Sequence, residues 1–137
     1  MNRPPLQAIL WDIDGTLLDS EPWHQQATIA VCREHGYALS DADYAATLGI
    51  AFPEFYARLH ARQPMPLSFA AWVEAITDRY IARLAQVAPR DGAFALVEAF
   101  AAKGLRQVCV SNSGRRVVEA NLAAIARAMG GAPFEFA

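Results

Sequence analysis

Residues 7–17 read Gln-Ala-Ile-Leu-Trp-Asp-Ile-Asp-Gly-Thr-Leu. The apolar run up to Asp12 is short and stops abruptly at acidic residues, which is typical of a strand buried on both faces of a parallel sheet. Asp12 and Asp14 therefore stand at the carboxyl end of a strand, where open parallel sheets bind ligands. Because glycine tolerates sharp turns, we expect Gly15 to bring the two carboxylates toward one pocket.

A second strand is expected where polar side chains again follow an apolar segment. The residues Ser-Asn-Ser at 111–113 come after that segment and before Gly114. The expected elements of this half are, in order, a helix over 93–103, a strand over 106–110, a helix over 115–129 and the start of a third strand at 134–137. Strand, helix and strand in this order favour a right-handed parallel crossover.

A helical segment separates the two strands. Its expected helices run from Glu21 to the stop at Gly36, from the cap at Ser40 to Gly49, from Pro53 to the break at 63–66, and from Ser68 to Gln86. Ser40 with Asp43 three residues later resembles a capping box. Aromatic side chains at helical spacing, Trp72 and Tyr80 among them, are expected to pack inside the resulting bundle.

Composition limits the classes of function. The chain has 137 residues, 54% of them hydrophobic, which is enough for a compact core. Its 12 basic and 14 acidic residues are spread without runs and leave a net charge of -2, so we expect a small molecule as partner, not nucleic acid or a membrane. Cys32 and Cys109 lie in apolar segments and no signal-peptide pattern opens the chain, so we expect a soluble, cytoplasmic protein.

The acidic turn and the Ser-Asn-Ser triplet together predict phosphoryl transfer. A carboxylate such as Asp12 can attack phosphorus if a nearby acid or base handles the leaving oxygen and a divalent cation offsets the charge. The hydroxyl and amide groups at 111–113 can hold phosphate oxygens. The alternative is that Asp14 and Gly15 only mark a turn, which is the usual role of an isolated Asp-Gly pair.

Two motifs resemble those of the haloacid dehalogenase superfamily. Asp-Ile-Asp-Gly-Thr at 12–16 matches the first motif, and the strand that ends at Ser111 is similar to the second. The longer run 12–22 looks like the opening of the β-phosphoglucomutase and phosphoglycolate phosphatase branch. Since Asp14 supplies an acid that halide removal does not need, the dehalogenase branch itself is disfavoured.

The resemblance implies both a fold and a function. The fold is α/β, with a partial doubly wound parallel, Rossmann-like core over 1–19 and 88–137 and an α-helical bundle cap inserted at 20–87. The function is that of a Mg²⁺-dependent phosphohydrolase, which acts on a small phosphorylated metabolite through an aspartyl-phosphate intermediate.

Carried over position by position, the resemblance also assigns roles to individual residues. Asp12 is the implied nucleophile and Asp14 the implied general acid and base. Both are implied to bind Mg²⁺, Asp12 through its carboxylate and Asp14 through its backbone carbonyl. The residues implied to contact the substrate or its phosphate are Gly15, Thr16, His24, Ser111 and Asn112. For His24, which the branch places at a cap hinge, the alternative is an exposed helix histidine.

The family's third motif, a lysine, and its fourth, a pair of acids, have no match after Ser111. The single lysine, Lys103, precedes the second motif, and Arg115 and Arg116 are expected to face solvent. The acids after Asn112 are Glu119 and Glu135. Charge on the phosphoryl group would then stay largely uncompensated, so we expect this chain to be weakly active or inactive.

The expected sheet is also incomplete, because two or three strands cannot form a doubly wound core and apolar edges should stay exposed. We therefore expect a truncated product, a proteolytic fragment, or a protomer whose sheet is completed by a second copy or a missing C-terminal half. Two other functions stay open, a non-catalytic remnant that dimerises and a β-phosphoglucomutase-like phosphomutase. Phe52 stands where the mutase places a basic residue, which disfavours the mutase.

Overall fold

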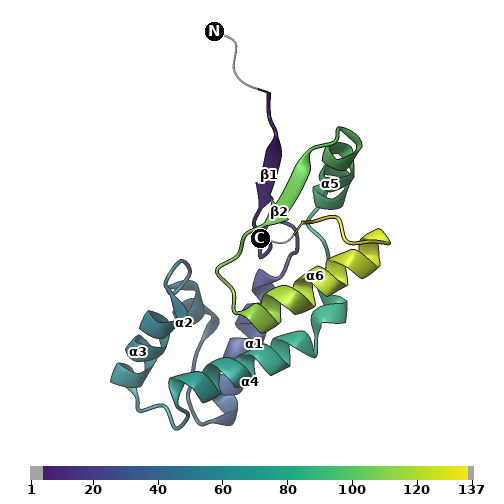
Figure 1. Ribbon diagram of the computed structural model, residues 1–137. Coiled ribbons are helices and arrows are strands. Elements are labelled where there is room, and N and C mark those ends of the chain that lie inside the picture. Colours follow the sequence, from purple (N-terminus) through teal and green to yellow (C-terminus); the bar gives the residue numbers. More distant parts are fainter. Residues whose placement is uncertain (1–4, 136–137) are drawn as a thin grey trace. The chain divides into compact units, whose positions relative to one another are not determined.

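The computed structural model describes residues 5–135 (Figure 1). By its internal contacts the chain divides into two units. One holds Glu21 and the residues before it together with Leu84 and the residues after it, and the other is Pro22–Arg83. The expected insert over 20–87 differs from the second unit by a few residues at each end; that this unit acts as a cap stays a prediction. No helix within 5–135 combines the length and apolar character needed to cross a membrane.

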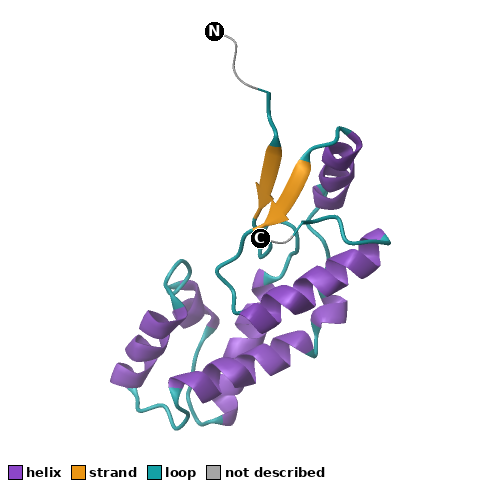
Figure 2. Cartoon of the chain, viewed as in Figure 1, coloured by secondary structure: helices purple, strands orange, loops and turns teal. Residues whose placement is uncertain are grey.

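The first unit contains a short parallel sheet with helices (Figure 2). Its elements are β1 (Ala8–Trp11), the 3-10 turn η1 (Leu84–Gln86), α5 (Ala93–Ala102), β2 (Arg106–Cys109) and α6 (Arg115–Met129). The register runs from Ala8 opposite Arg106 to Trp11 opposite Cys109. The first two expected strands and both expected helices of this half are confirmed, and the α/β class with them.

The expected third strand begins at the end of the described chain. Glu135 forms an isolated parallel bridge with Val108, and its backbone N–H donates to the carbonyl of Gln107 at 2.8 Å. The Arg106 guanidinium pairs with the Glu135 carboxylate at 2.6 Å. Since β1 pairs with the other edge of β2, this bridge extends the sheet by one position, and the remainder of the expected strand, 136–137, lies outside the described residues.

The core of the first unit gathers around the turn that follows β1. Its buried side chains are Ile13, Leu17, Leu18, Ala93, Val97, Leu122 and Ile125. Gln107, only 3% exposed, ties the sheet to α5, because its Oε1 accepts from Trp11 Nε1 at 2.8 Å and its Nε2 donates to the Val97 carbonyl at 2.9 Å. The strands and α5 are thus fixed by a polar bridge as well as by apolar packing.

The expectation that the first strand is buried on both faces is wrong. Pleating places Trp11 and its partner Cys109 on one face, where both pack against the core cluster. Leu10 and its partner Val108 lie on the other face, and Leu10 is 70% exposed. The apolar sequence of β1 therefore suits a sheet covered on both sides, whereas the described residues cover only one.

The second unit is helical, as expected. Its helices are α1 (Glu21–Glu34), α2 (Asp41–Ala45), α3 (Phe52–Arg62) and α4 (Phe69–Ile81). Helix α4 ends earlier than predicted, and the expected continuation to Gln86 is instead the turn η1. Helix α2 ends at Ala45, so the expected stop at Gly49 closes a turn beyond the helix.

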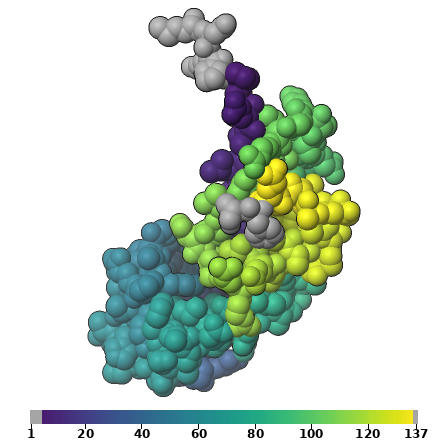
Figure 3. Space-filling view, viewed as in Figure 1, coloured from purple at the N-terminus to yellow at the C-terminus, as the bar shows by residue number. Residues whose placement is uncertain are grey.

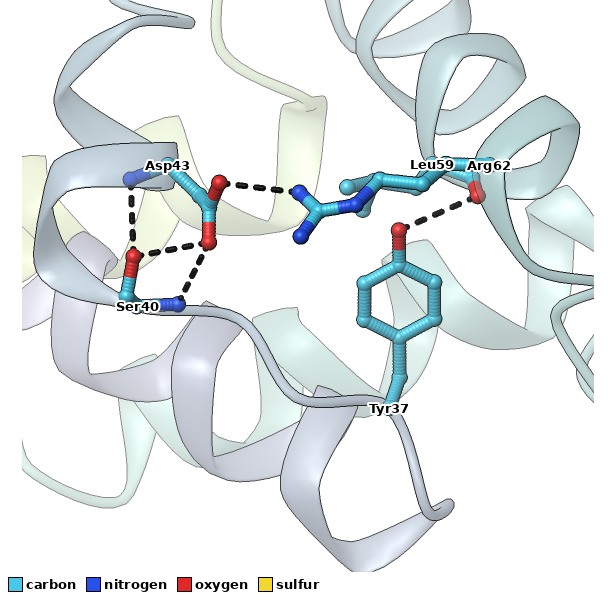
Figure 4. A network of polar contacts seen from close by, with 5 residues as sticks. All are labelled: Tyr37, Ser40, Asp43, Leu59 and Arg62. Atoms are coloured by element: carbon cyan, nitrogen blue, oxygen red, sulfur yellow. Dashed lines mark hydrogen bonds and ion pairs between the residues drawn. The ribbon is translucent and has the colours of Figure 1, made fainter.

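An aromatic core and a capping network hold this second unit together. The rings of Phe55 and Trp72 meet edge to face with centroids 5.5 Å apart, and Trp72 is fully buried, which confirms its predicted packing role. The predicted capping box is also present, because Ser40 Oγ accepts from the N–H of Asp43 at 3.1 Å while the Asp43 carboxylate accepts from the N–H of Ser40 at 3.1 Å (Figure 4).

Candidate active site

The turn after β1 is anchored by apolar residues. The carbonyl of Ile13 accepts from the N–H groups of Thr16, Leu17 and Leu18 at 3.2, 2.9 and 3.0 Å. Gly15 has a φ of +74°, a conformation that side chains disfavour, and its N–H donates to the Leu18 carbonyl at 2.8 Å. Gly15 thus makes the sharp turn that the sequence predicts, with Ile13, Leu17 and Leu18 all buried beneath it.

Asp12 is the exposed member of the acidic pair. Its Oδ1 accepts from the N–H of Ile13 at 2.9 Å, and its Oδ2 lies 3.4 Å from Thr16 Oγ1. Beside Asp12, burial first and the Asp12 carboxylate second raise the pKa of the Cys109 thiol to about 12. Asp12 therefore presents a carboxylate to solvent beside a thiol that stays protonated.

Asp14, separated from Asp12 by the buried Ile13, is held much more firmly. Its Oδ1 accepts from Ser20 Oγ at 2.7 Å and from Asn121 Nδ2 at 3.3 Å. Its Oδ2 accepts from Ser113 Oγ at 2.7 Å. The three donors come from the segment before α1, from the loop after β2 and from α6, so this half-buried carboxylate joins three parts of the first unit.

The polar triplet after β2 lies beside the acidic turn because the two strands end together. Pairing extends one residue past the strands, where the N–H of Val110 donates to the carbonyl of Trp11 at 2.7 Å. Ser111 Oγ accepts from the N–H of Ser113 at 3.1 Å, and Asn112 is exposed. The contact to the acidic pair is made by Ser113, which sequence alone placed only among groups able to hold phosphate. The phosphate roles of Ser111 and Asn112 stay predictions.

Sequence reasoning gave Ser20 and Asn121 no role in the site. Asn121 occupies the buried side of α6 together with Val117, Leu122 and Ile125, while the opposite side of the helix lies at the surface (Figure 3). An asparagine at an apolar position of an amphipathic helix is the signal that marks it, since a buried amide requires hydrogen bonds.

His24 belongs to α1 in the second unit. Its ring stacks on that of Tyr80, with centroids 3.9 Å apart and planes inclined by 9°. The alternative of an exposed helix histidine is therefore wrong, because the side chain is half-buried against an aromatic face. The contact of His24 with substrate stays a prediction.

The donors expected for Mg²⁺ are the Asp12 carboxylate and the Asp14 backbone carbonyl. Within residues 5–135 no group of three or more His, Cys, Asp or Glu side chains is arranged to hold a metal ion. Mg²⁺ is commonly held by one or two carboxylates, with water and phosphate oxygens completing its octahedral shell. Two hard oxygen donors at a solvent-exposed turn fit such a partial shell.

The charged groups considered for the missing motifs lie at the surface. Lys103 is exposed at the end of α5. Arg115 pairs with Glu119 at 3.8 Å on the surface of α6, and Glu135 pairs with Arg106. The predicted exposure of Arg115 is confirmed. Neither ion pair includes a residue of the turn at 12–16.

Comparison with known proteins gives a family and several solved structures with a similar fold. The model of the haloacid dehalogenase-like hydrolases matches residues 6–135. The search of curated protein sequences gave no match.

Among solved structures, CbbY from Rhodobacter sphaeroides in complex with phosphate is 29% identical, with a TM-score of 0.78 over 88% of this chain and 57% of that one. A mutant of the same protein in complex with xylulose-(1,5)bisphosphate is 28% identical over the same shares, also with a TM-score of 0.78. A candidate β-phosphoglucomutase from Thermotoga maritima, 16% identical with a TM-score of 0.72 over 96% of this chain and 60% of that one, shares the fold. The chain thus spans about 57% of the length of CbbY.

Proposed function

The chain belongs to the haloacid dehalogenase-like hydrolase family, and from this premise we propose a Mg²⁺-dependent phosphohydrolase that acts on a small phosphorylated metabolite through an aspartyl-phosphate at Asp12. The contact between Asp14 and Ser113 carries the proposal, because it joins the acidic turn after β1 to the polar loop after β2. A phosphate bound at this edge of the sheet would meet carboxylate, hydroxyl and amide groups together.

The proposed reaction has two steps. In the first, an oxygen of the Asp12 carboxylate attacks phosphorus, and the bond between phosphorus and the ester oxygen breaks. The ester oxygen leaves with the electron pair of that bond and takes a proton from Asp14. In the second, water gives a proton to Asp14 and attacks the phosphorus of the aspartyl-phosphate, which releases inorganic phosphate and restores Asp12.

The geometry supports this division of roles. Asp12 is exposed, and the backbone N–H of Ile13 orients its carboxylate from one side. Asp14 is half-buried, and hydrogen bonds at both carboxylate oxygens hold the group at a fixed position. Mg²⁺, held by the Asp12 carboxylate and the Asp14 carbonyl, would offset the negative charge of the phosphoryl oxygens.

The substrate class is proposed from the similar structures. CbbY was solved with phosphate and, as a mutant, with a sugar bisphosphate. With 29% identity over 88% of this chain, that likeness favours a sugar phosphate among small phosphorylated metabolites.

Two alternatives are weighed against this proposal. A phosphomutase would return the phosphoryl group to substrate. The mutase has a basic residue at the position of Phe52. Phe52 instead packs edge to face on Trp72 with ring centroids 5.5 Å apart. A non-catalytic remnant is the second alternative, because Arg115 pairs with Glu119 on the surface of α6 and no lysine follows Ser111 in the sequence to offset charge on the phosphoryl group. We therefore propose that this chain alone has weak activity or none.

The proposed partner of the chain concerns the uncovered face of the sheet. Leu6 and Leu10 of the N-terminal segment and Val110 after β2 are 62%, 70% and 53% exposed. We propose that a second copy or a further stretch of polypeptide covers this face and completes the sheet. We also propose a cytoplasmic location, which suits the unpaired thiols of Cys32 and Cys109.

The direct experiment measures phosphate release from a panel of sugar phosphates, with Mg²⁺ present and after its removal by chelation. We expect slow release that requires Mg²⁺ and is abolished in Asp12→Asn, a variant of nearly the same shape that lacks the nucleophilic carboxylate. Equal release by the Asp12→Asn variant would refute the nucleophile. Release by neither protein, from a chain shown to be folded, would favour the non-catalytic alternative.

A further inference from the structure

Asn121 is a polar residue on the apolar side of α6. It is 0% exposed, and the other buried side chains of the helix are Val117, Leu122 and Ile125. An amide placed among apolar groups destabilises a fold unless it is hydrogen bonded. Its Nδ2 lies 3.3 Å from Asp14 Oδ1, so the position of Asn121 in the core is tied to the acidic turn.

The carboxyl group of Asp14 receives donors at both oxygens. Ser20 and Asn121 donate to Oδ1, and Ser113 donates to Oδ2. A carboxyl group bonded through one oxygen can still turn about its Cβ–Cγ bond, whereas donors at both oxygens fix its plane. Ser20 and Asn121 are themselves fully buried, so neither donor can follow a turning carboxyl group.

We infer that Asn121 and Ser113 are positioning residues, which fix the plane of the Asp14 carboxyl group. The inference rests on the proposed function, in which Asp14 gives a proton to the leaving oxygen. A general acid works only when its oxygen lies within hydrogen-bond reach of that atom, and its contribution is about 10²–10⁴-fold. Asn121 and Ser113 act through Asp14. Their substitution should therefore lower kcat most for substrates whose leaving group must be protonated.

Two phosphate esters with different leaving groups test this. p-Nitrophenyl phosphate releases a stable phenolate that needs little protonation, whereas glycerol phosphate releases an alkoxide that needs a proton. Asn121→Leu removes the donor but keeps a side chain of similar size. We expect it to lower kcat by about 10-fold or more for glycerol phosphate and by less than about 3-fold for p-nitrophenyl phosphate, with KM unchanged for both.

Matched variants separate positioning from folding. Ser113→Ala should show the same dependence on leaving group, and Ser113→Thr, which keeps the hydroxyl, should recover most of kcat. Glu119→Gln changes an exposed residue of the same helix and should leave both esters unaffected. An equal loss of kcat on both esters in Asn121→Leu would assign Asn121 to the fold alone and overturn the inference.

A measurement independent of activity covers the case in which the proposed function fails. In the NMR spectrum of the intact chain, the side-chain amide signals of Asn121 should shift in Asp14→Ala and stay in place in Glu119→Gln, while the backbone amide spectrum shows that both variants are folded. Asn121 signals that do not respond to Asp14→Ala would overturn the inference. A response in a chain that hydrolyses neither ester would uphold the fixed carboxyl group and favour the non-catalytic alternative.

Discussion

The hydroxyl of Ser113 donates a 2.7 Å hydrogen bond to Oδ2 of Asp14, across 99 positions of sequence. The bond joins the loop after β2 to the turn after β1. The parallel register, which sets Trp11 opposite Cys109, brings these two segments to the same edge of the sheet. The acidic turn is therefore stabilised by residues far from it in the chain. Substitution of those residues should change the environment of the Asp14 carboxylate.

Ser20 should contribute measurably to stability through Asp14. It is 0% exposed, and its hydroxyl donates to Asp14 Oδ1 at 2.7 Å. Ser20→Ala leaves a partly buried carboxylate oxygen short of a donor, so we expect the free energy of unfolding to fall by about 1–3 kcal/mol. Urea unfolding followed by circular dichroism measures this change.

A double-mutant cycle with Asp14→Ala isolates that bond. If the bond stabilises the fold, Ser20→Ala should cost clearly less in the Asp14→Ala background than in the unchanged chain. Equal costs in the two backgrounds would mean that Ser20 acts through packing and not through Asp14.

Much of the first unit follows from local sequence. The strand that ends at Asp12 is predicted by its apolar run before acids, and the structure has it at 8–11; the helix over 115–129, predicted to follow Gly114, has the same bounds as α6. Gly15 was predicted for the same reason, since a tight turn after a strand favours a residue that accepts positive φ. Where one local preference decides, the sequence is sufficient.

The contacts of Asp14 could not be predicted in this way. Asn121 reaches Asp14 only after α6 has packed against the turn, and nothing near Asn121 in the chain shows which residue that will be. The exposure of Leu10 was missed for a related reason. An apolar run indicates that a strand is suited to burial, but it does not indicate whether other residues of the described chain pack over both of its faces. Both depend on tertiary contacts.

Gln107 should be a second residue whose loss is costly. It is 3% exposed and bridges Trp11 Nε1 and the Val97 carbonyl with bonds of 2.8 and 2.9 Å. Gln107→Leu fills the space but leaves the Trp11 Nε1 donor without this acceptor and removes the bond to the Val97 carbonyl, so we expect a loss of about 2 kcal/mol or more in unfolding free energy. Its neighbour Arg106 forms an exposed ion pair with Glu135, so Arg106→Gln should cost much less than Gln107→Leu. Similar losses in the two variants would contradict the bridge.

The capping network of α2 should make stability depend on pH (Figure 4). Hydrogen bonds from Ser40, and then from the Arg62 guanidinium, lower the pKa of Asp43 from 3.8 to about 2. Because the pKa is lower in the folded state, this stabilisation is present above the unfolded value of 3.8 and is lost as pH falls toward 2.

Comparison of the chain with Asp43→Asn tests that dependence. The unfolding midpoint of the variant should lie below that of the unchanged chain at about pH 6, and the difference should shrink as pH falls through the Asp43 pKa. Arg62→Gln removes one of the donors and should weaken the dependence without abolishing it. A difference between chain and variant that persists undiminished at low pH would show that the Asp43 charge is not its source.

The uncovered face of the sheet should make the chain associate. Leu10 lies on that face, Leu6 and Val110 lie just outside the two strands, and each of the three residues is more than half exposed. Sedimentation velocity should show a mass that rises with concentration. Leu10→Lys places a charge on this face and should shift the chain toward monomer, as charges do on natural sheet edges.

Leu48→Lys is the matched control for Leu10→Lys, because Leu48 is also exposed, at 56%, but lies in the helical unit. If association runs through the sheet, Leu48→Lys should sediment like the unchanged chain while Leu10→Lys does not. If both variants dissociate, the cause is general apolar exposure. If the unchanged chain is monomeric at every concentration, the sheet face stays exposed to solvent and a second copy does not cover it. Of the two proposed covers, only a further stretch of polypeptide would then remain.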